Sequence, residues 1–180
     1  MLERTLTLNP DSRHALVSLA RTYAYMGDVR RLQDVSGTLE KKAQYNLDML
    51  NTSGTLLVLQ NNMRGVALID HAIADNPDPP SRYYIGKFVA AMMGEDLAAA
   101  HAAIAKIDAE SYSSVLSRIL DAAYEARTGN LAAARASWEQ AKQDKPILRV
   151  LPGAFLKTLP ASPEVQAKLT SWLRPAVAGL

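Results

Sequence analysis

Apolar residues recur every three or four positions through most of the chain, and short polar segments with glycine, asparagine or proline interrupt them. Leu16, Leu19 and Tyr23 lie at this spacing, and the pattern resumes after Gly27 with Leu32. Spacing of three and four brings side chains onto one face of an α-helix, whereas a half-buried strand needs strict alternation. The pattern therefore predicts an all-α protein built from helical hairpins.

Turn residues divide the predicted helices at nearly regular intervals. Gly27, Asn61, Gly94 and Gly129 are separated by 34, 33 and 35 residues. Glycine and asparagine most readily take the left-handed backbone conformation with which many helices end. A period of this length is typical of an α-solenoid, in which each hairpin buries its apolar face against its neighbours. We therefore expect a helical repeat array whose function lies on its surface.

The turns also predict how this single domain is divided. Leu2, Leu6 and Leu8 precede Pro10, and a helix usually ends at or before the residue that precedes a proline. We interpret residues 1–10 as the end of a truncated repeat, and the chain as part of a longer protein. The units that follow are four repeats and a C-terminal cap, at 11–44, 45–77, 78–111, 112–146 and 147–180.

Two of these units carry complementary halves of one repeat motif, the first its first helix and turn, the fourth its turn and second helix. The first contains Leu16, Leu19, Ala20, Tyr23 and Gly27, and the fourth contains Gly129, Leu131, Ala134, Trp138, Ala141 and Pro146. These residues resemble the motif of the tetratricopeptide repeat family. The resemblance implies a right-handed α-solenoid of about four hairpins, with a leading half-repeat, whose first helices line a concave groove.

The chain departs from the family motif in several places. Leu32 stands where the family has a small residue, which predicts a wider separation of the helices in the first hairpin. The second unit is one residue short, and the third and fourth carry an extra residue near the first helix or its turn. In these last two units the resemblance predicts the architecture without fixing which residues face the groove.

By the same resemblance, nine residues on the first helices face the groove: His14, Val17, Arg21, Tyr25, Asn51, Thr55, Leu59, Tyr83 and Lys87. Arg21 and Lys87 would bind anionic groups, and Asn51 would bind a peptide backbone. Tyr25 and Tyr83 would add amphipathic contact area. The groove therefore predicts binding of a protein or peptide. The alternatives are that these residues are ordinary exposed helix surface, or that repeats further upstream hold the true site.

Composition and charge narrow the class of partner. The chain is 48% hydrophobic and has no cysteine, which favours a packed domain without disulfides or thiolate chemistry. Its 20 basic and 18 acidic residues give a formal net charge of +2 with no long block of either sign, so nucleic acid is not an expected partner. No apolar run reaches the roughly 18 residues that span a membrane, and we expect a cytoplasmic protein.

The last segment is both amphipathic and basic. Val165, Leu169, Trp172 and Leu173 form a stripe, which predicts a helix that caps the last exposed face of the array. Over the longer segment 142–174, six basic residues stand against two acidic ones, namely Lys142, Lys145, Arg149, Lys157, Lys168 and Arg174 against Asp144 and Glu164. This excess would suit an acidic partner surface, and a solvated cap is the alternative.

Residues for catalysis or metal binding are sparse. His71 lies four residues before Asp75, which places the pair on one helical face, but a single pair makes no metal site. Solvated helix surface is the alternative for this pair. His14 and His101 have no acid or nucleophile at a suggestive spacing, and no phosphate-binding loop or metalloprotease motif occurs. We therefore expect a protein that is not an enzyme and that uses no metal or cofactor.

Three hypotheses about function follow. The leading one is a non-catalytic scaffold that binds a polypeptide partner, or another domain of its own chain, through the groove. Residues 169–180 resemble the close of repeat tails in bacterial adenylate cyclases and winged-helix regulators, which implies a regulatory or dimerisation domain. The third is a structural assembly unit, a homodimer formed through the unpaired apolar segment 2–8 at the N-terminal end.

Overall fold

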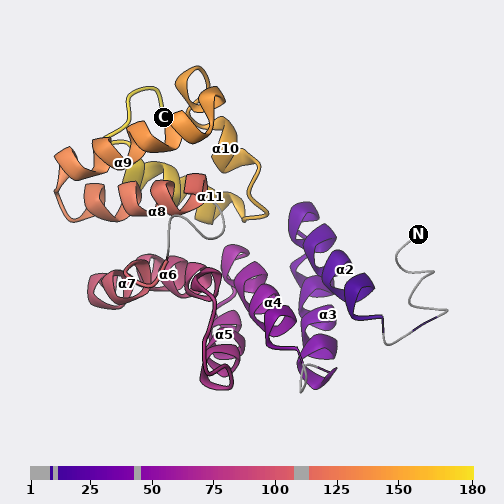
Figure 1. Ribbon diagram of the computed structural model, residues 1–180. Helices are drawn as coiled ribbons and strands as arrows, with labels where there is room; N and C mark the ends of the chain where they lie inside the picture. The colour runs from indigo at the N-terminus through magenta and orange to yellow at the C-terminus, as the bar shows by residue number, and fades with distance from the viewer. Residues whose placement is uncertain (1–8, 10–11, 43–45, 108–113) are drawn as a thin grey trace.

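The computed structural model describes residues 9, 12–42, 46–107 and 114–180, and all regular structure in these ranges is helical (Figure 1). The predicted all-α class is confirmed for this part of the chain. The predicted half-repeat at 1–10, and the pairing of two copies through it, lie outside the described residues apart from Asn9. The helices are α2 (Arg13–Met26), α3 (Val29–Lys42), α4 (Leu47–Leu59), α5 (Arg64–Ala74), α6 (Tyr84–Met93), α7 (Leu97–Ile104), α8 (Ser114–Arg127), α9 (Leu131–Asp144), α10 (Ala154–Lys157) and α11 (Pro163–Leu173), with 3₁₀ turns η2 (Ser81–Tyr83) and η3 (Pro146–Arg149).

The hairpins α2/α3, α4/α5, α6/α7 and α8/α9 close with the same turn. In each turn one residue is left-handed, and the next residue donates its N–H to a carbonyl five positions earlier, as in a Schellman motif. The left-handed residues are Gly27, Asn61, Glu95 and Gly129, with φ of 67°, 59°, 60° and 89°, and each follows the previous one by 34 positions. The hydrogen bonds are Asp28 N to Tyr23 O (2.9 Å), Asn62 N to Leu57 O (2.9 Å), Asp96 N to Ala91 O (2.9 Å) and Asn130 N to Glu125 O (2.8 Å).

The third turn differs from the sequence prediction by one residue. Gly94 has a φ of −83°, and Glu95 takes the left-handed conformation instead. The reason is the cap of the following helix, because Asp96 accepts a hydrogen bond from Ala99 N at 2.9 Å and the left-handed residue directly precedes this cap. The irregular intervals predicted from Gly94 were therefore wrong, since the left-handed residues recur every 34 positions.

The α4/α5 hairpin packs backbone against backbone. A Cβ atom on Gly65 would lie 2.2 Å from Gly54 O, and one on Gly54 would lie 2.6 Å from Gly65 O. A Cβ atom on Gly86 of α6 would lie 2.5 Å from Ile69 Cδ1. These three glycines let α4, α5 and α6 approach more closely than any side chain would allow. The first hairpin instead buries Leu32 on α3.

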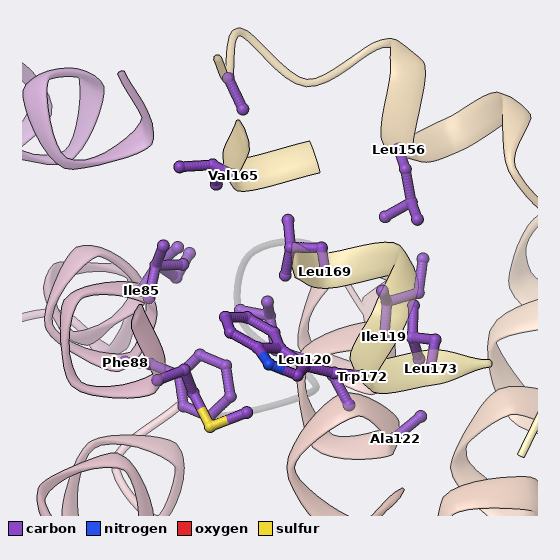
Figure 2. Packing of buried hydrophobic residues seen from close by; sticks show 14 of the residues in the cluster. Ile85, Phe88, Ile119, Leu120, Ala122, Leu156, Val165, Leu169, Trp172 and Leu173 are labelled. Carbon is purple, nitrogen blue, oxygen red and sulfur yellow. The ribbon is translucent and has the colours of Figure 1, made fainter. Parts of the chain in front are cut away.

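The first three hairpins stack through their first helices, because α2 packs against α4 and α4 packs against α6. This order changes at α8, which packs mainly against α9 and α11. Figure 2 shows Leu169 and Trp172 of α11 between Phe88 of α6 and Ile119 of α8, all in one buried cluster. The described residues thus form three stacked hairpins and a fourth hairpin, with α11 packed into the core between them.

The tail reaches back to the second hairpin. Gln60 Nε2 donates hydrogen bonds to Ala24 O at 2.8 Å and to Pro160 O at 2.9 Å. Ser162 N donates to Leu59 O at 2.8 Å. We expected the tail to cap the last exposed face of the array. The apolar stripe of α11 is buried as predicted, but it faces α8 and the α6 side of the core.

Candidate functional site

A cleft of about 340 Å³ lies between α2 and α4. Three of the nine predicted groove residues line it, and all three belong to α2. The full lining is His14, Val17, Ser18 and Arg21 on the α2 side and Asn46, Asp48, Met49 and Thr52 on the α4 side. The cleft is therefore the place where predicted groove residues border an open space.

Burial of one face of α2 directs the opposite face to the cleft. Leu16, Leu19 and Tyr23 are buried in the first hairpin and its neighbours. His14 and Arg21 lie two helical turns apart on the other face and remain exposed. The apolar stripe seen in the sequence thus sets which α2 residues reach the cleft.

The two walls of the cleft carry opposite charges. Asp48 Oδ1 accepts hydrogen bonds from Arg82 Nη2 at 2.5 Å and from Tyr83 Oη at 2.6 Å, so this carboxylate already has a cationic partner. On the α2 wall, neither Arg21 nor His14 has an ion-pair or hydrogen-bond partner among the described residues. The Arg21 guanidinium is therefore free to pair with a carboxylate or a carbonyl of a bound molecule.

Two predicted groove residues are buried partners of each other. Asn51 Nδ2 donates to Tyr83 O at 3.2 Å, and the two residues are 4% and 1% exposed. The η2 turn after Pro80 places Tyr83 against α4, where its hydroxyl reaches Asp48. Burial, reinforced by this hydrogen bond, raises the pKa of Tyr83 above its ordinary value. Asn51 and Tyr83 hold η2 onto α4 and do not border the cleft.

The remaining predicted residues have separate environments. Leu59 is buried. Thr55 is partly exposed, but its hydroxyl oxygen is buried and has no hydrogen-bond partner among the described residues. Lys87 Nζ forms an ion pair of 2.5 Å with Asp70 Oδ1. Tyr25 is 65% exposed near the end of α2 and is not part of the cleft lining.

The packing of the next elements explains why the predicted groove residues of α2 stay open and their equivalents on α4 do not. Val17 and Arg21 on α2 correspond to Asn51 and Thr55 on α4, 34 positions later. The turn η2 and helix α6 pack against α4, and a Cβ atom on Gly86 would lie 2.8 Å from Thr55 Oγ1. The equivalent α2 surface borders the cleft instead.

Sequence reasoning missed the α4 wall of the cleft. Asp48, Met49 and Thr52 line it but were not among the predicted residues. A signal was present, because Asp48 follows His14 by 34 positions and Thr52 follows Ser18 by 34 positions. The period therefore relates the two walls to each other.

The predicted histidine and aspartate pair forms on α5. His71 Nε2 and Asp75 Oδ2 lie 3.0 Å apart, and both side chains are more than half exposed. Within the described ranges no three potential metal ligands gather, and none of the described helices has the length and apolar character needed to cross a bilayer. Comparison of the chain with family models, with curated proteins and with solved structures gives no match, so the functional evidence comes from its own residues.

Proposed function

We propose that this chain is a non-catalytic, cytoplasmic interaction scaffold that binds a polypeptide in the cleft between α2 and α4. The observation that carries the proposal is Arg21, a cleft residue without an ionic partner among the described residues. Val17 beside it and Met49 on the opposite wall supply apolar surface, and methionine adapts its shape to different side chains. Apolar contacts around a charged anchor are typical of polypeptide recognition.

The size of the cleft limits what it accommodates. Its volume of about 340 Å³ is near the lower end of ligand pockets, which span about 300–1,000 Å³. A space of this size between two helices holds one or two side chains of an extended segment. We expect a carboxylate of the partner at Arg21 and an apolar side chain between Val17 and Met49.

The turns support a repeat scaffold. They recur every 34 positions, the period of tetratricopeptide arrays, and we assign the stacked hairpins α2 to α7 to this type as part of the proposal. Proteins of this architecture bind through the surfaces of their helices. Because η2 and α6 cover α4 and α11 packs against α8, the proposed binding surface is limited to the α2/α4 cleft.

A peptide selection tests the proposal. Short random peptides are selected against the wild-type protein, and fluorescence anisotropy gives their Kd for the wild type, Arg21→Glu and Arg30→Glu. Arg30 lies exposed on α3 without an ionic partner in the described chain, so it controls for the change of charge. We expect Arg21→Glu to weaken binding about tenfold, the effect of losing one charge-assisted contact.

Two outcomes would contradict the proposal. One is that no peptide is recovered, and the other is that every recovered peptide binds Arg21→Glu as tightly as it binds the wild type. Circular dichroism of the three proteins should be identical, because Arg21 and Arg30 are both exposed.

A further inference from the structure

Exposed apolar side chains gather in the turn that follows α9. Ile147, Val150 and Leu151 are 45%, 75% and 55% exposed, whereas Leu148 between them is 1% exposed. Val150 N and Leu151 N donate to Ile147 O at 3.1 and 2.9 Å, so hydrogen bonds and a buried leucine hold the turn. We call the three exposed residues the η3 surface. Exposed apolar residues grouped in this way mark interaction sites.

A cleft of about 260 Å³ adjoins this turn. Trp138 of α9 and Val177 of the tail, both buried, are the apolar part of a lining that also contains charged residues. Arg149 and Pro152 line the cleft too, and in the sequence they flank the last two residues of the η3 surface. The η3 surface and the cleft are therefore neighbours along the chain, with Leu148, Arg149 and Pro152 lining the cleft between and beside the exposed residues.

The charges that line this cleft are mainly positive. Lys142 Nζ pairs with Glu139 Oε1 at 2.6 Å, so these two charges offset each other. Arg135 and Arg149 also line the cleft, and neither has an ionic partner in the described part of the chain. The nearby Asp144 already pairs with an arginine of α8 at 2.7 Å. Two uncompensated guanidinium groups therefore lie beside the η3 surface.

We propose that the η3 surface and its cleft form a second docking site, for an acidic polypeptide segment that carries an aliphatic side chain. Carboxylates of this segment pair with Arg135 and Arg149, and the aliphatic side chain covers Val150 and Leu151. Figure 1 shows α9 and the end of the chain, marked C, apart from α2, and the two clefts have no lining residue in common. The site is therefore separate from the α2/α4 cleft and does not depend on the function proposed there.

Charge and shape favour a polypeptide over other anionic ligands. Nucleic acids bind through many cations placed along a backbone, whereas this site offers two arginines in a chain with a formal net charge of +2. A bilayer is recognised by a broad basic face. Here part of the apolar surface, at Trp138 and Val177, lines a cleft, which a side chain enters and a flat membrane does not.

Peptide selection with two double variants tests this site. Short random peptides selected against the wild type are measured on Arg135→Glu/Arg149→Glu and on Val150→Ser/Leu151→Ser. Arg30→Glu/Lys41→Glu on α3 is the matched control, since both residues are exposed. We expect a group of acidic, leucine-containing or valine-containing peptides whose affinity falls about tenfold on each test variant. The control and Arg21→Glu should bind this group like the wild type.

The result distinguishes the two proposed sites. If every recovered peptide loses affinity on Arg21→Glu and none does on Arg135→Glu/Arg149→Glu, the second site is overturned and the first is supported. The proposal also fails if the peptides that lose affinity on Arg135→Glu/Arg149→Glu carry no excess of acidic residues. Vesicles that contain phosphatidylserine and a single-stranded DNA of mixed sequence are tested in parallel. Binding of either probe through Arg135 and Arg149, without peptide binding, would overturn the polypeptide assignment.

Discussion

Asn51 and Tyr83 are joined by a buried hydrogen bond of 3.2 Å from a side-chain amide to a backbone carbonyl. The bond links α4 to the turn before α6, across 32 positions of sequence. The family resemblance assigned Asn51 to recognition of a peptide backbone, but in this chain its amide donates inside the fold. The residue therefore stabilises the stack of hairpins.

Asn51→Ala should lower stability and leave peptide binding unchanged. The substitution removes the hydrogen bond that the buried Asn51 amide donates to the Tyr83 carbonyl, and the net loss of such a bond costs about 0.5–1.5 kcal/mol. Urea unfolding measures the stability, and anisotropy with the peptides that require Arg21 measures the binding. If the variant bound peptide more weakly at unchanged stability, Asn51 would belong to the binding surface after all.

Gly65→Ala and Gly37→Ala should have opposite effects. A Cβ atom on Gly65 would lie 2.2 Å from Gly54 O, and forcing packed elements apart costs about 1–3 kcal/mol or more. A Cβ atom on Gly37 of α3 meets nothing within 4 Å, and replacing a glycine inside a helix by alanine gains about 0.5–1 kcal/mol. Thermal unfolding of both variants checks this. A Gly65→Ala protein with the same unfolding temperature as the wild type would contradict the close contact of α4 and α5.

The stability of the wild type should fall in alkaline solution through Tyr83. Burial and the hydrogen bond to Asp48 raise the pKa of Tyr83 in the folded protein, above the unfolded value of about 10. Its contribution to stability is therefore complete below the unfolded pKa and is lost as pH rises toward the folded pKa. Urea midpoints on either side of about pH 10 should fall more for the wild type than for Tyr83→Phe, and equal decreases would contradict the assignment.

Gln60→Ala should loosen the tail. Its amide nitrogen donates to Ala24 O and to Pro160 O, and the loss of buried hydrogen bonds costs about 1–3 kcal/mol. The substitution should therefore increase the rate of amide hydrogen exchange in α11 more than in α9. Gln33→Ala on the exposed side of α3 is the control and should leave the exchange rates of both helices unchanged. Equal exchange in the variant and the wild type would contradict a role of Gln60 in holding α11.

Local structure was largely predictable from the sequence. The turn predicted at Gly27 separates α2 from α3, because Gly27 takes the left-handed conformation that stops one helix and Asp28 accepts a hydrogen bond from Arg31 N at the start of the next. The error at Gly94 also arises from the combination of a helix stop and a helix cap. Glycine is the usual left-handed residue, but Asp96 caps the next helix and moves the turn to Glu95.

The packing partners of each helix were much harder to predict. The stripe of α11 indicated that residues such as Leu169 would be buried, but an amphipathic stripe does not identify the surface that covers it. The groove residues show the same limit. Val17 and Asn51 occupy equivalent repeat positions, yet Val17 borders a cleft while η2 covers Asn51. Which copy stays exposed depends on the next helix in space, and this information is not in the period.

The contact between Gln60 and Pro160 spans 100 positions, which has a consequence for folding kinetics. In arrays whose units contact only their neighbours, folding starts anywhere and spreads from unit to unit. Here the α6 surface around Phe88 is covered by α11, which is synthesised after a complete intervening hairpin. During translation the first three hairpins emerge with this apolar surface uncovered, and long-range closure is slow. The interval before α11 emerges is therefore when the nascent chain is most exposed to aggregation and to chaperones.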